Sequence, residues 1–171
     1  MKSNRTSVLF VCTHNSARSQ MAEGLLRAFH GDRFEAFSAG TEPTTVHPMA
    51  VKAMAELGID ISRARSKSLD EFRDRQLDYV ITVCDRAHQN CPFFAGGRHH
   101  LHKGFGDPAQ AGLTGEELLP AFRRTRDQLR EWIEKELVPS ADGGGGPALS
   151  GADASTPASG WKFFRTGDHG D

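Results

Sequence analysis

Hydrophobic positions along the chain follow two different spacings. Short apolar runs rich in β-branched or aromatic residues are typical of strands buried in a parallel sheet. Such runs predict strands at 8–11, 34–38, 79–83 and 100–103. Apolar residues three or four positions apart predict amphipathic helices, here at 19–30, 47–57 and 118–137. Ser68 and Thr114 are each followed three residues later by glutamate, which is the spacing of a helix-capping box.

Strands that alternate with helices in this way predict an α/β fold. We expect a single Rossmann-like domain of three layers, in which helices cover both faces of a four-stranded parallel sheet. Sheets of this type bind ligands beyond the carboxyl ends of their strands. Cys12 and Cys84 follow the strands at 8–11 and 79–83, so both thiols are expected at this edge.

Composition changes at Pro139, so the folded domain is expected to comprise residues 1–138. Residues 139–171 consist largely of Gly, Ala, Ser, Pro and Asp. Such a segment buries too little apolar surface to offset the entropy of ordering, and we predict a disordered tail. Its one apolar patch, Trp161-Lys-Phe-Phe-Arg165, is interpreted as a sticky part of a flexible tail, with a docking peptide as the alternative.

The totals narrow the class of protein. The 171 residues are 37% hydrophobic, enough for one core, and carry a formal net charge of -1. A charge so close to zero favours neither nucleic acid nor an anionic membrane as the main partner. The chain has three cysteines, no apolar leader and no run of 18 apolar residues. We therefore expect a cytoplasmic protein with reduced thiols.

The loop after the first strand joins a cysteine to an arginine six residues later. A strand, a short loop and a helix N-terminus make an anion site, because backbone N–H groups converge there and the helix dipole adds positive potential. The residues expected to bind an oxyanion are Thr13, His14, Asn15, Ser16, Ala17, Arg18 and Ser19. Arg18 offers a bidentate donor, and the same field is expected to lower the pKa of the Cys12 thiol.

Two other interpretations of this loop are weaker. A nucleotide P-loop would end in Gly-Lys-Ser or Gly-Lys-Thr, which is missing here. Cys12 and Arg18 can also occur at this spacing by chance, as a buried thiol beside a surface guanidinium. The strand before the loop, the helix after it and the polar residues within it favour the anion site.

The segment Cys12-Thr-His-Asn-Ser-Ala-Arg-Ser-Gln-Met-Ala-Glu-Gly24 resembles the signature loop of the low-molecular-weight protein tyrosine phosphatase superfamily. Within this superfamily, the chain is most similar to the thioredoxin-coupled arsenate reductases. The resemblance runs from about 7 to 137. It includes the segments 38–40, 58–62, 80–84, 91–92 and 107–109.

The resemblance implies roles for the loop residues. Cys12 matches the nucleophile and Arg18 the arginine that binds the oxyanion. Ser19 matches a serine that holds the thiolate, and Asn15 matches the residue that braces the loop. Asp107, which precedes Pro108, matches the general acid that protonates the leaving oxygen.

The resemblance also implies that Cys84 and Cys91 are the two relay cysteines of the reductases, which end a cycle as a disulfide. The segment between them could begin as a helix, in which seven residues rise about 10.5 Å. A disulfide needs Cα atoms within about 7 Å. We therefore predict that 85–90 unwinds on oxidation and presents the disulfide to thioredoxin.

Three positions depart from the family pattern. His14 stands where many members have glycine, and histidine tolerates a positive φ better than most residues. Ala17 stands where some members have a dispensable cysteine. Lys67 stands where some reductases have an aspartate of a potassium site, together with residues like Asn15, Glu23 and Ser38. We hypothesise that the Lys67 ammonium substitutes for that ion.

Phosphate and arsenate have nearly the same shape and charge, so the loop alone does not separate phosphatase from reductase. Tyrosine phosphatases of the superfamily usually have aromatic residues after this Asp-Pro, whereas Ala109, Gln110 and Ala111 follow here. We therefore expect reduction of arsenate to arsenite. Two alternatives remain open, namely a low-molecular-weight phosphatase that keeps Cys84 and Cys91 for oxidative protection, and a non-catalytic oxyanion or redox sensor.

No organic cofactor and no metal is expected. Cys84, His88 and Cys91 supply only three ligands by spacing, and neighbouring histidines at 99 and 100 would point to opposite faces of a strand. The expected partners are arsenate, with phosphate or sulfate as competing oxyanions, and thioredoxin as the electron donor. We expect a monomer.

Overall fold

The computed structural model describes residues 4–90, 96–109 and 112–142. These residues form a four-stranded sheet in the order β2-β1-β3-β4, in which every pair of neighbouring strands is parallel. The strands are β1 (Thr6–Cys12), β2 (Phe34–Gly40), β3 (Leu77–Thr82) and β4 (Gly97–His102). The predicted parallel α/β sheet is thus confirmed, and each strand includes most of the run that predicted it.

Strand β1 lies at the centre of the core. Val8, Leu9, Phe10 and Val11 have no exposed surface, because β2 and β3 flank the strand and helices cover it. The chain leaves β1 toward β2 on one side and later returns to β3 on the other. The carboxyl end of β1 is therefore the point where the strand order reverses, which is where open α/β sheets bind ligands.

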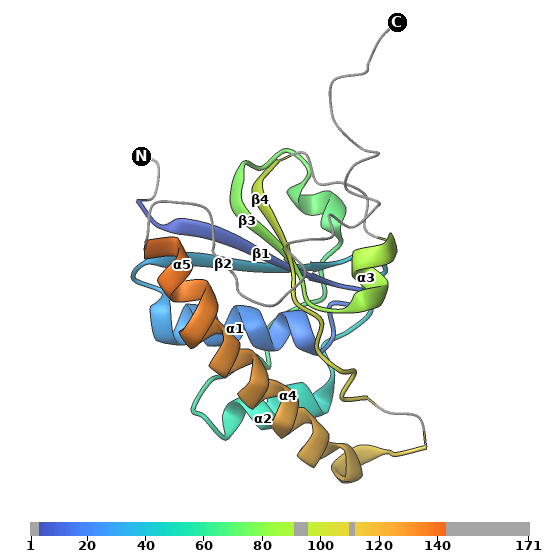
Figure 1. Ribbon diagram of the computed structural model, residues 1–171. Helices are drawn as coiled ribbons and strands as arrows, with labels where there is room; N and C mark the ends of the chain where they lie inside the picture. The colour runs from blue at the N-terminus through green and yellow to red at the C-terminus, as the bar shows by residue number, and fades with distance from the viewer. Residues whose placement is uncertain (1–3, 91–95, 110–111, 143–171) are drawn as a thin grey trace, which may run out of the picture.

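Most helices lie on one face of the sheet. Figure 1 shows α1, α2, α4 and α5 below the strands, the short green turn η1 on the opposite side, and α3 beside the carboxyl ends. The α-helices are α1 (Arg18–His30), α2 (Pro48–Ala55), α3 (Asp85–Asn90), α4 (Leu119–Trp132) and α5 (Val138–Asp142). The 3-10 turns η1 (Leu69–Phe72) and η2 (Gly115–Leu118) follow the two predicted capping boxes, and η3 (Ile133–Leu137) is a π-helical segment.

The C-terminal helical segment differs from its prediction. It was expected to end at Leu137, but a π-helical turn follows α4 and the helix then continues to Asp142. Pro139 does not break it, because proline is tolerated in the first turn of a helix and the turn here is that of α5. The predicted tail and its Trp161–Arg165 patch otherwise lie outside the described residues.

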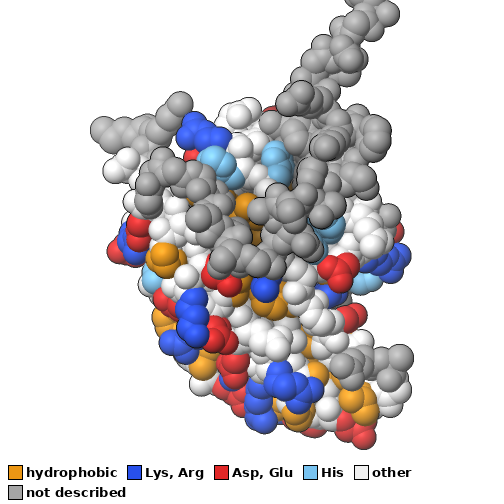
Figure 2. Space-filling view, in the orientation of Figure 1, with side chains coloured by type: hydrophobic (Ala, Val, Ile, Leu, Met, Phe, Trp, Pro, Cys, Tyr) orange, Lys and Arg blue, Asp and Glu red, His pale blue; other side chains and the backbone are white. Residues whose placement is uncertain are grey.

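Charged residues of both signs are distributed over the surface. Figure 2 shows lysine, arginine, aspartate and glutamate side chains intermixed over the helices. Pairs such as Lys135–Glu131 and Arg123–Glu56, with N–O distances of 2.6 and 2.7 Å, account for part of this pattern. In the part of the chain that the structure describes, no helix has the length and apolarity needed to cross a membrane.

Candidate active site

The loop from Cys12 to Ser16 turns its carbonyl groups outward. The backbone N–H groups of the segment after β2 approach them at 2.8 to 3.2 Å: Thr41 donates to Cys12, Glu42 to Thr13, Thr44 to His14 and His47 to Ser16. The remaining carbonyl, that of Asn15, accepts from the Ser66 hydroxyl at 2.7 Å. Because five successive carbonyls are bound from outside, the N–H groups of the loop are left for its concave side, as an oxyanion site requires.

Gly40 allows this contact between the loop and strand β2. A Cβ atom at this position would lie 2.6 Å from the Thr13 carbonyl oxygen and 2.9 Å from the Asn15 nitrogen. Both distances are shorter than van der Waals contact, so any other residue would push the loop away from β2.

Asn15, and not His14, has the left-handed backbone conformation. Its φ is 49°, and it is the only non-glycine residue with positive φ among the described residues. The expectation that His14 would occupy this conformation is therefore wrong. Asparagine tolerates the left-handed region because its short polar side chain can form local hydrogen bonds. His14 is exposed, and its Nδ1 lies 3.1 Å from the Glu42 carbonyl oxygen.

The Asn15 side chain is held from three directions and has no exposed surface. Its Oδ1 accepts from the Lys67 backbone N–H at 2.8 Å and from Gln20 Nε2 at 2.9 Å. These two donors fix the orientation of the amide, so Nδ2 donates to Ser19 Oγ at 2.8 Å. The brace expected of Asn15 thus reaches the hydroxyl that contacts Cys12.

The direction of the next hydrogen bond follows from this orientation. Ser19 Oγ accepts from Asn15 and carries one proton of its own, which it can direct at Cys12 Sγ, 2.7 Å away. The Asn15 backbone N–H also points at this sulfur at 3.2 Å. Donors aimed at one sulfur stabilise its thiolate form.

Burial nevertheless dominates the acidity of Cys12, whose side chain is in the core with 3% exposure. Desolvation raises the pKa of the Cys12 thiol above its ordinary value, and the nearby Cys84 adds to this. Hydrogen bonds from Ser19 and Asn15 lower the pKa without offsetting burial. The expected low pKa is therefore not found, because the pattern revealed the donors but not the depth of the sulfur.

Arg18 links the loop to the segment that follows β4. Its Nη1 donates to the Phe105 carbonyl oxygen at 2.9 Å, and the Phe105 N–H donates to the Val83 carbonyl at 3.0 Å. Two residues further on, Asp107 is exposed, and its Oδ1 accepts from the Ala109 N–H at 2.9 Å. The arginine and the segment with the expected general acid therefore contact each other directly.

His47 lies beside this site and was not identified from the sequence. It is the N-cap of α2, where its Nδ1 accepts from the Met49 N–H at 3.0 Å, and its ring packs on Phe122 with centroids 4.6 Å apart. Burial lowers the pKa of the His47 imidazole, and the nearby Asp107 carboxylate opposes the shift. The signal that could have found it is the histidine before Pro48 at a helix start, a position where side chains cap the helix.

Lys67 lies below the loop, next to two buried polar side chains. Its Nζ is 3.5 Å from both Glu23 Oε2 and Ser38 Oγ, and it donates to the Arg65 carbonyl at 3.2 Å. Ser38 also donates to Glu23 through a short hydrogen bond. The ammonium thus occupies the position among these groups that the cation hypothesis requires, and the hypothesis remains a prediction.

Cys84 is buried at the junction of β3 and α3, close to the loop. Its Sγ lies 3.5 Å from Thr13 Oγ1 and accepts from the Ala87 N–H at 3.3 Å. The segment after it is helical, as the prediction for the reduced form assumed. Cys91 and the predicted Cys84–Cys91 disulfide lie outside the described residues. Among the described residues, no group of three His, Cys, Asp or Glu is placed to hold a metal ion.

Comparisons with known proteins agree with this geometry. The family model for low molecular weight phosphotyrosine protein phosphatase matches residues 7–135. An arsenate reductase from Halalkalibacterium halodurans is 44% identical over 131 residues, which cover 77% of this chain and 94% of that protein. A solved arsenate reductase in the phosphate binding state has a TM-score of 0.65 at 35% identity, covering 75% of this chain and 94% of its own. The thioredoxin-dependent arsenate reductase of Corynebacterium glutamicum has a TM-score of 0.57 at 31% identity, covering 78% and 63% of the two chains.

Proposed function

Because the chain belongs to the low molecular weight phosphotyrosine protein phosphatase family, and within it to the arsenate reductases, we propose that it reduces arsenate to arsenite. The observation that supports this most directly is the second buried thiol. Cys84 Sγ lies 3.5 Å from Thr13 Oγ1, in the loop that begins with Cys12. A phosphatase needs one nucleophilic thiol at this loop, whereas a reductase needs a second thiol to accept the oxidising equivalents.

In the first step, Cys12 attacks arsenate held by the loop. The loop N–H groups and the Arg18 guanidinium bind the oxyanion, and Arg18 leaves Phe105 to do so. The sulfur displaces one arsenate oxygen, which departs as water after Asp107 supplies a proton. The buried Cys12 thiol loses its proton in the same step, and this proton replaces the one that Asp107 gave, so that thiol and dihydrogen arsenate give a thiol–arsenate adduct and water.

In the second step, the Cys84 sulfur attacks Cys12. A disulfide forms between them, the sulfur–arsenic bond breaks, and its electron pair remains with arsenic. As(V) thereby becomes As(III) and leaves as arsenite, while two thiols have become one disulfide. Thr13 contacts Cys84, and strands β1 and β3 are direct neighbours, so the two sulfurs approach over a short path.

In the third step, Cys91 attacks Cys84 and releases Cys12 as a thiol. The oxidising equivalents are then held as a Cys84–Cys91 disulfide, which a dithiol of thioredoxin reduces. Helix α3 is the segment that must unwind to allow this bond, because a helix keeps the two Cα atoms too far apart. We place the protein in the cytoplasm, where such thiols are kept reduced, and expect it to act as a monomer.

The proposal is tested by following NADPH consumption with thioredoxin and thioredoxin reductase after adding arsenate to the wild type and to Cys91→Ser. Sustained arsenate-dependent turnover in the wild type alone would establish the relay. Hydrolysis of an aryl phosphate is measured in parallel. Rapid hydrolysis that Cys91→Ser leaves unchanged, without arsenate turnover in either protein, would contradict the reductase and favour the phosphatase.

A further inference from the structure

Four polar residues at the end of the sheet form a hydrogen-bonded group that the proposed chemistry does not use. We call Thr82, Asp85, His88 and His102 the histidine cluster. His88 Nδ1 lies 3.3 Å from Thr82 Oγ1, which lies 2.9 Å from His102 Nδ1. His102 Nε2 lies 2.9 Å from Asp85 Oδ1. The two imidazole rings are stacked, with centroids 3.9 Å apart and planes 23° apart.

The direction of each hydrogen bond follows from the groups present. The Asp85 carboxylate only accepts, so His102 Nε2 carries a proton and donates it. Nδ1 of a neutral His102 is then an acceptor 2.9 Å from Thr82 Oγ1, nearer than the Leu101 carbonyl oxygen at 3.4 Å, so the Thr82 hydroxyl donates to His102. Since the only proton of that hydroxyl is used, Thr82 Oγ1 accepts from His88 Nδ1.

This chain of hydrogen bonds begins and ends on the same short helix. His88 and Asp85 belong to α3, whereas Thr82 belongs to β3 and His102 to β4. Asp85 is therefore tied to the sheet through the His102 imidazole, and His88 is tied to it through Thr82 while its ring stacks on His102. Thr82 is fully buried in β3, so it provides a fixed point in the sheet to which the two histidines are hydrogen-bonded.

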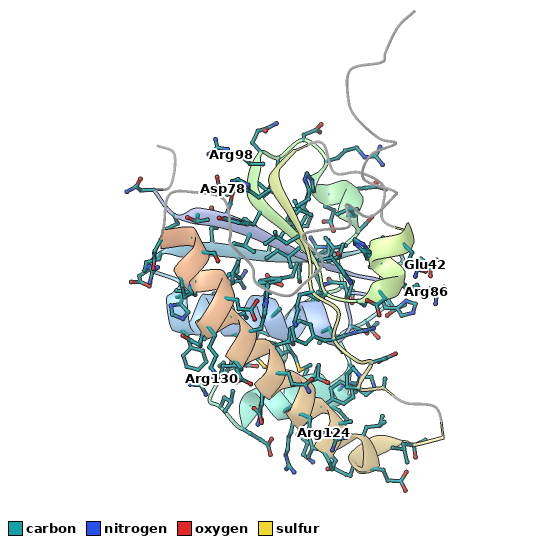
Figure 3. The ribbon with its side chains drawn as sticks, in the orientation of Figure 1. Glu42, Asp78, Arg86, Arg98, Arg124 and Arg130 are labelled. Atoms are coloured by element: carbon teal, nitrogen blue, oxygen red, sulfur yellow. The ribbon has the colours of Figure 1, made fainter. Side chains whose placement is uncertain are left out.

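Other surface contacts of α3 are weaker. Arg86 reaches toward Glu42, as Figure 3 shows, but their closest N–O distance is 3.8 Å and both side chains are more than 60% exposed. Exposed pairs of this kind contribute little. Asp85 is instead packed over Gly104, where a Cβ atom would lie 2.5 Å from Asp85 Oδ1. Gly104 leaves room for this side chain, which is 80% exposed, and the contact with the partly buried His102 differs from the Arg86–Glu42 pair in its hydrogen-bond distance of 2.9 Å.

We propose that His102 is a positioning residue that keeps α3 helical, and that its release sets how readily Cys84 and Cys91 form their disulfide. This inference rests on the proposed relay, in which α3 must unwind. The unwound segment loses both ends of the histidine cluster. Contacts made only in the helical form favour the dithiol, so removing them favours the disulfide.

The test uses a Cys12→Ser background, in which Cys84 and Cys91 are the only thiols of the chain. The protein is equilibrated with glutathione buffers, where two thiols and oxidised glutathione give one intramolecular disulfide and two reduced glutathiones. His102→Ala is expected to raise the equilibrium constant for disulfide formation about tenfold, since two hydrogen bonds are lost. This corresponds to a potential about 30 mV more negative. Amide hydrogen exchange within α3 is expected to accelerate by a similar factor.

Asp85→Ala removes the exposed side chain that accepts the hydrogen bond from His102. We expect it to raise the equilibrium constant for disulfide formation as well, but by less than His102→Ala does. His102→Phe keeps a ring for stacking on His88 but has no ring nitrogen, so it separates stacking from hydrogen bonding. The matched control is His99→Ala, which removes another histidine of β4 that packs on Tyr79, away from α3.

Equilibrium constants and exchange rates of His102→Ala and Asp85→Ala within twofold of their parent would overturn the proposal. A parent protein that forms no Cys84–Cys91 disulfide in any glutathione buffer would contradict the relay itself. Hydrogen exchange needs no disulfide, so in that case it still decides whether His102 keeps α3 helical.

Discussion

The oxyanion loop and helix α3 meet at the same end of the sheet but are held in different ways. All five carbonyls from Cys12 to Ser16 are bound from outside the loop, and the buried Asn15 amide links three of its neighbours. Helix α3 has six residues, and His88 and Asp85 tie it to the sheet through the histidine cluster. In the proposed cycle, the backbone of the loop binds a tetrahedral anion without reorganising while the Arg18 side chain turns to it from Phe105, whereas the helix changes shape once.

This difference teaches that substitutions in the two regions should have opposite signatures. Changes in the loop should impair chemistry or stability, because its geometry is already the one that the reaction needs. Changes around α3 should shift an equilibrium between two forms and leave the loop intact.

Replacing the proposed nucleophile is expected to abolish turnover. Cys12→Ser should lower arsenate-dependent NADPH oxidation by about a thousandfold or more, because a hydroxyl here is neither a comparable nucleophile nor able to form the disulfide. The thioredoxin-coupled assay measures this, with thermal unfolding as the check that the fold remains. Turnover within tenfold of the wild type would exclude Cys12 as the nucleophile.

The proposed general acid should have the next largest effect. Asp107→Asn keeps an acceptor for the Ala109 N–H but removes the proton donor, and we expect adduct formation to slow about a hundredfold. Single-turnover release of arsenite measures this step. Asp127→Asn on α4 is the matched control, because Asp127 is exposed and pairs with Arg126. Equal slowing in both variants would argue against a role for Asp107 in proton transfer.

Removing the Asn15 side chain, which braces the loop, should lower the stability of the fold. Asn15→Ala is expected to lower the free energy of unfolding by about 2–4 kcal/mol, since it leaves buried groups unpaired and puts a Cβ-bearing residue in the left-handed region. Asn15→Gly permits this φ and should lose about 1 kcal/mol less. Urea unfolding of both variants checks the prediction. Equal stability of the two would mean that backbone strain at this position is negligible.

Lowering the pH should also favour the opening of α3, with a smaller effect than the substitutions described above. Burial lowers the pKa of the His88 imidazole, the adjacent His102 lowers it further, and Asp85 opposes them. The opened segment therefore binds a proton more readily than the helix, so opening is unaffected above about pH 6.5 and increases as the pH falls below that value. Amide hydrogen exchange within α3 at pH 7.5 and 5.5, corrected for intrinsic rates, measures this change in opening. His88→Gln should remove the dependence, and a wild type that opens more at high pH would contradict the sign.

The smallest expected effect is that of potassium. If the Lys67 ammonium substitutes for the cation, replacing sodium chloride by potassium chloride at equal ionic strength should leave the midpoint of thermal unfolding unchanged. The expectation follows from its position between Glu23 and Ser38. Lys67→Met removes the ammonium and serves as the comparison. A clear rise in the unfolding midpoint of the wild type in potassium chloride would contradict the hypothesis.

Local features of the sequence predicted most of the fold. The apolar runs identified the four strands of the sheet, and the cysteine between a strand and a helix indicated the anion loop, because these signals come from residues that are neighbours in the sequence. Contacts between residues that are far apart in the sequence could not be predicted from such local signals. His88 and His102 come from α3 and β4 and meet only when the sheet has formed. His47 reaches the site by capping α2.

The acidity of Cys12 likewise depends on tertiary structure that the sequence pattern does not reveal. The resemblance to the phosphatase family implied the roles of Ser19 and Asn15, but the pKa of the thiol depends first on burial. Burial results from the packing of the whole sheet. Asn15 and His14 are adjacent, and the choice of which has positive φ is made by contacts from Gln20 and the Lys67 backbone, which no local pattern reveals.

The depth of Cys12 has a consequence for its reactivity toward oxidants. Peroxides and alkylating agents react with thiolates that they can reach. Cys12 is 3% exposed and its thiol has a raised pKa, so we expect the proposed nucleophile to resist oxidation to sulfinic and sulfonic acid while no substrate is bound.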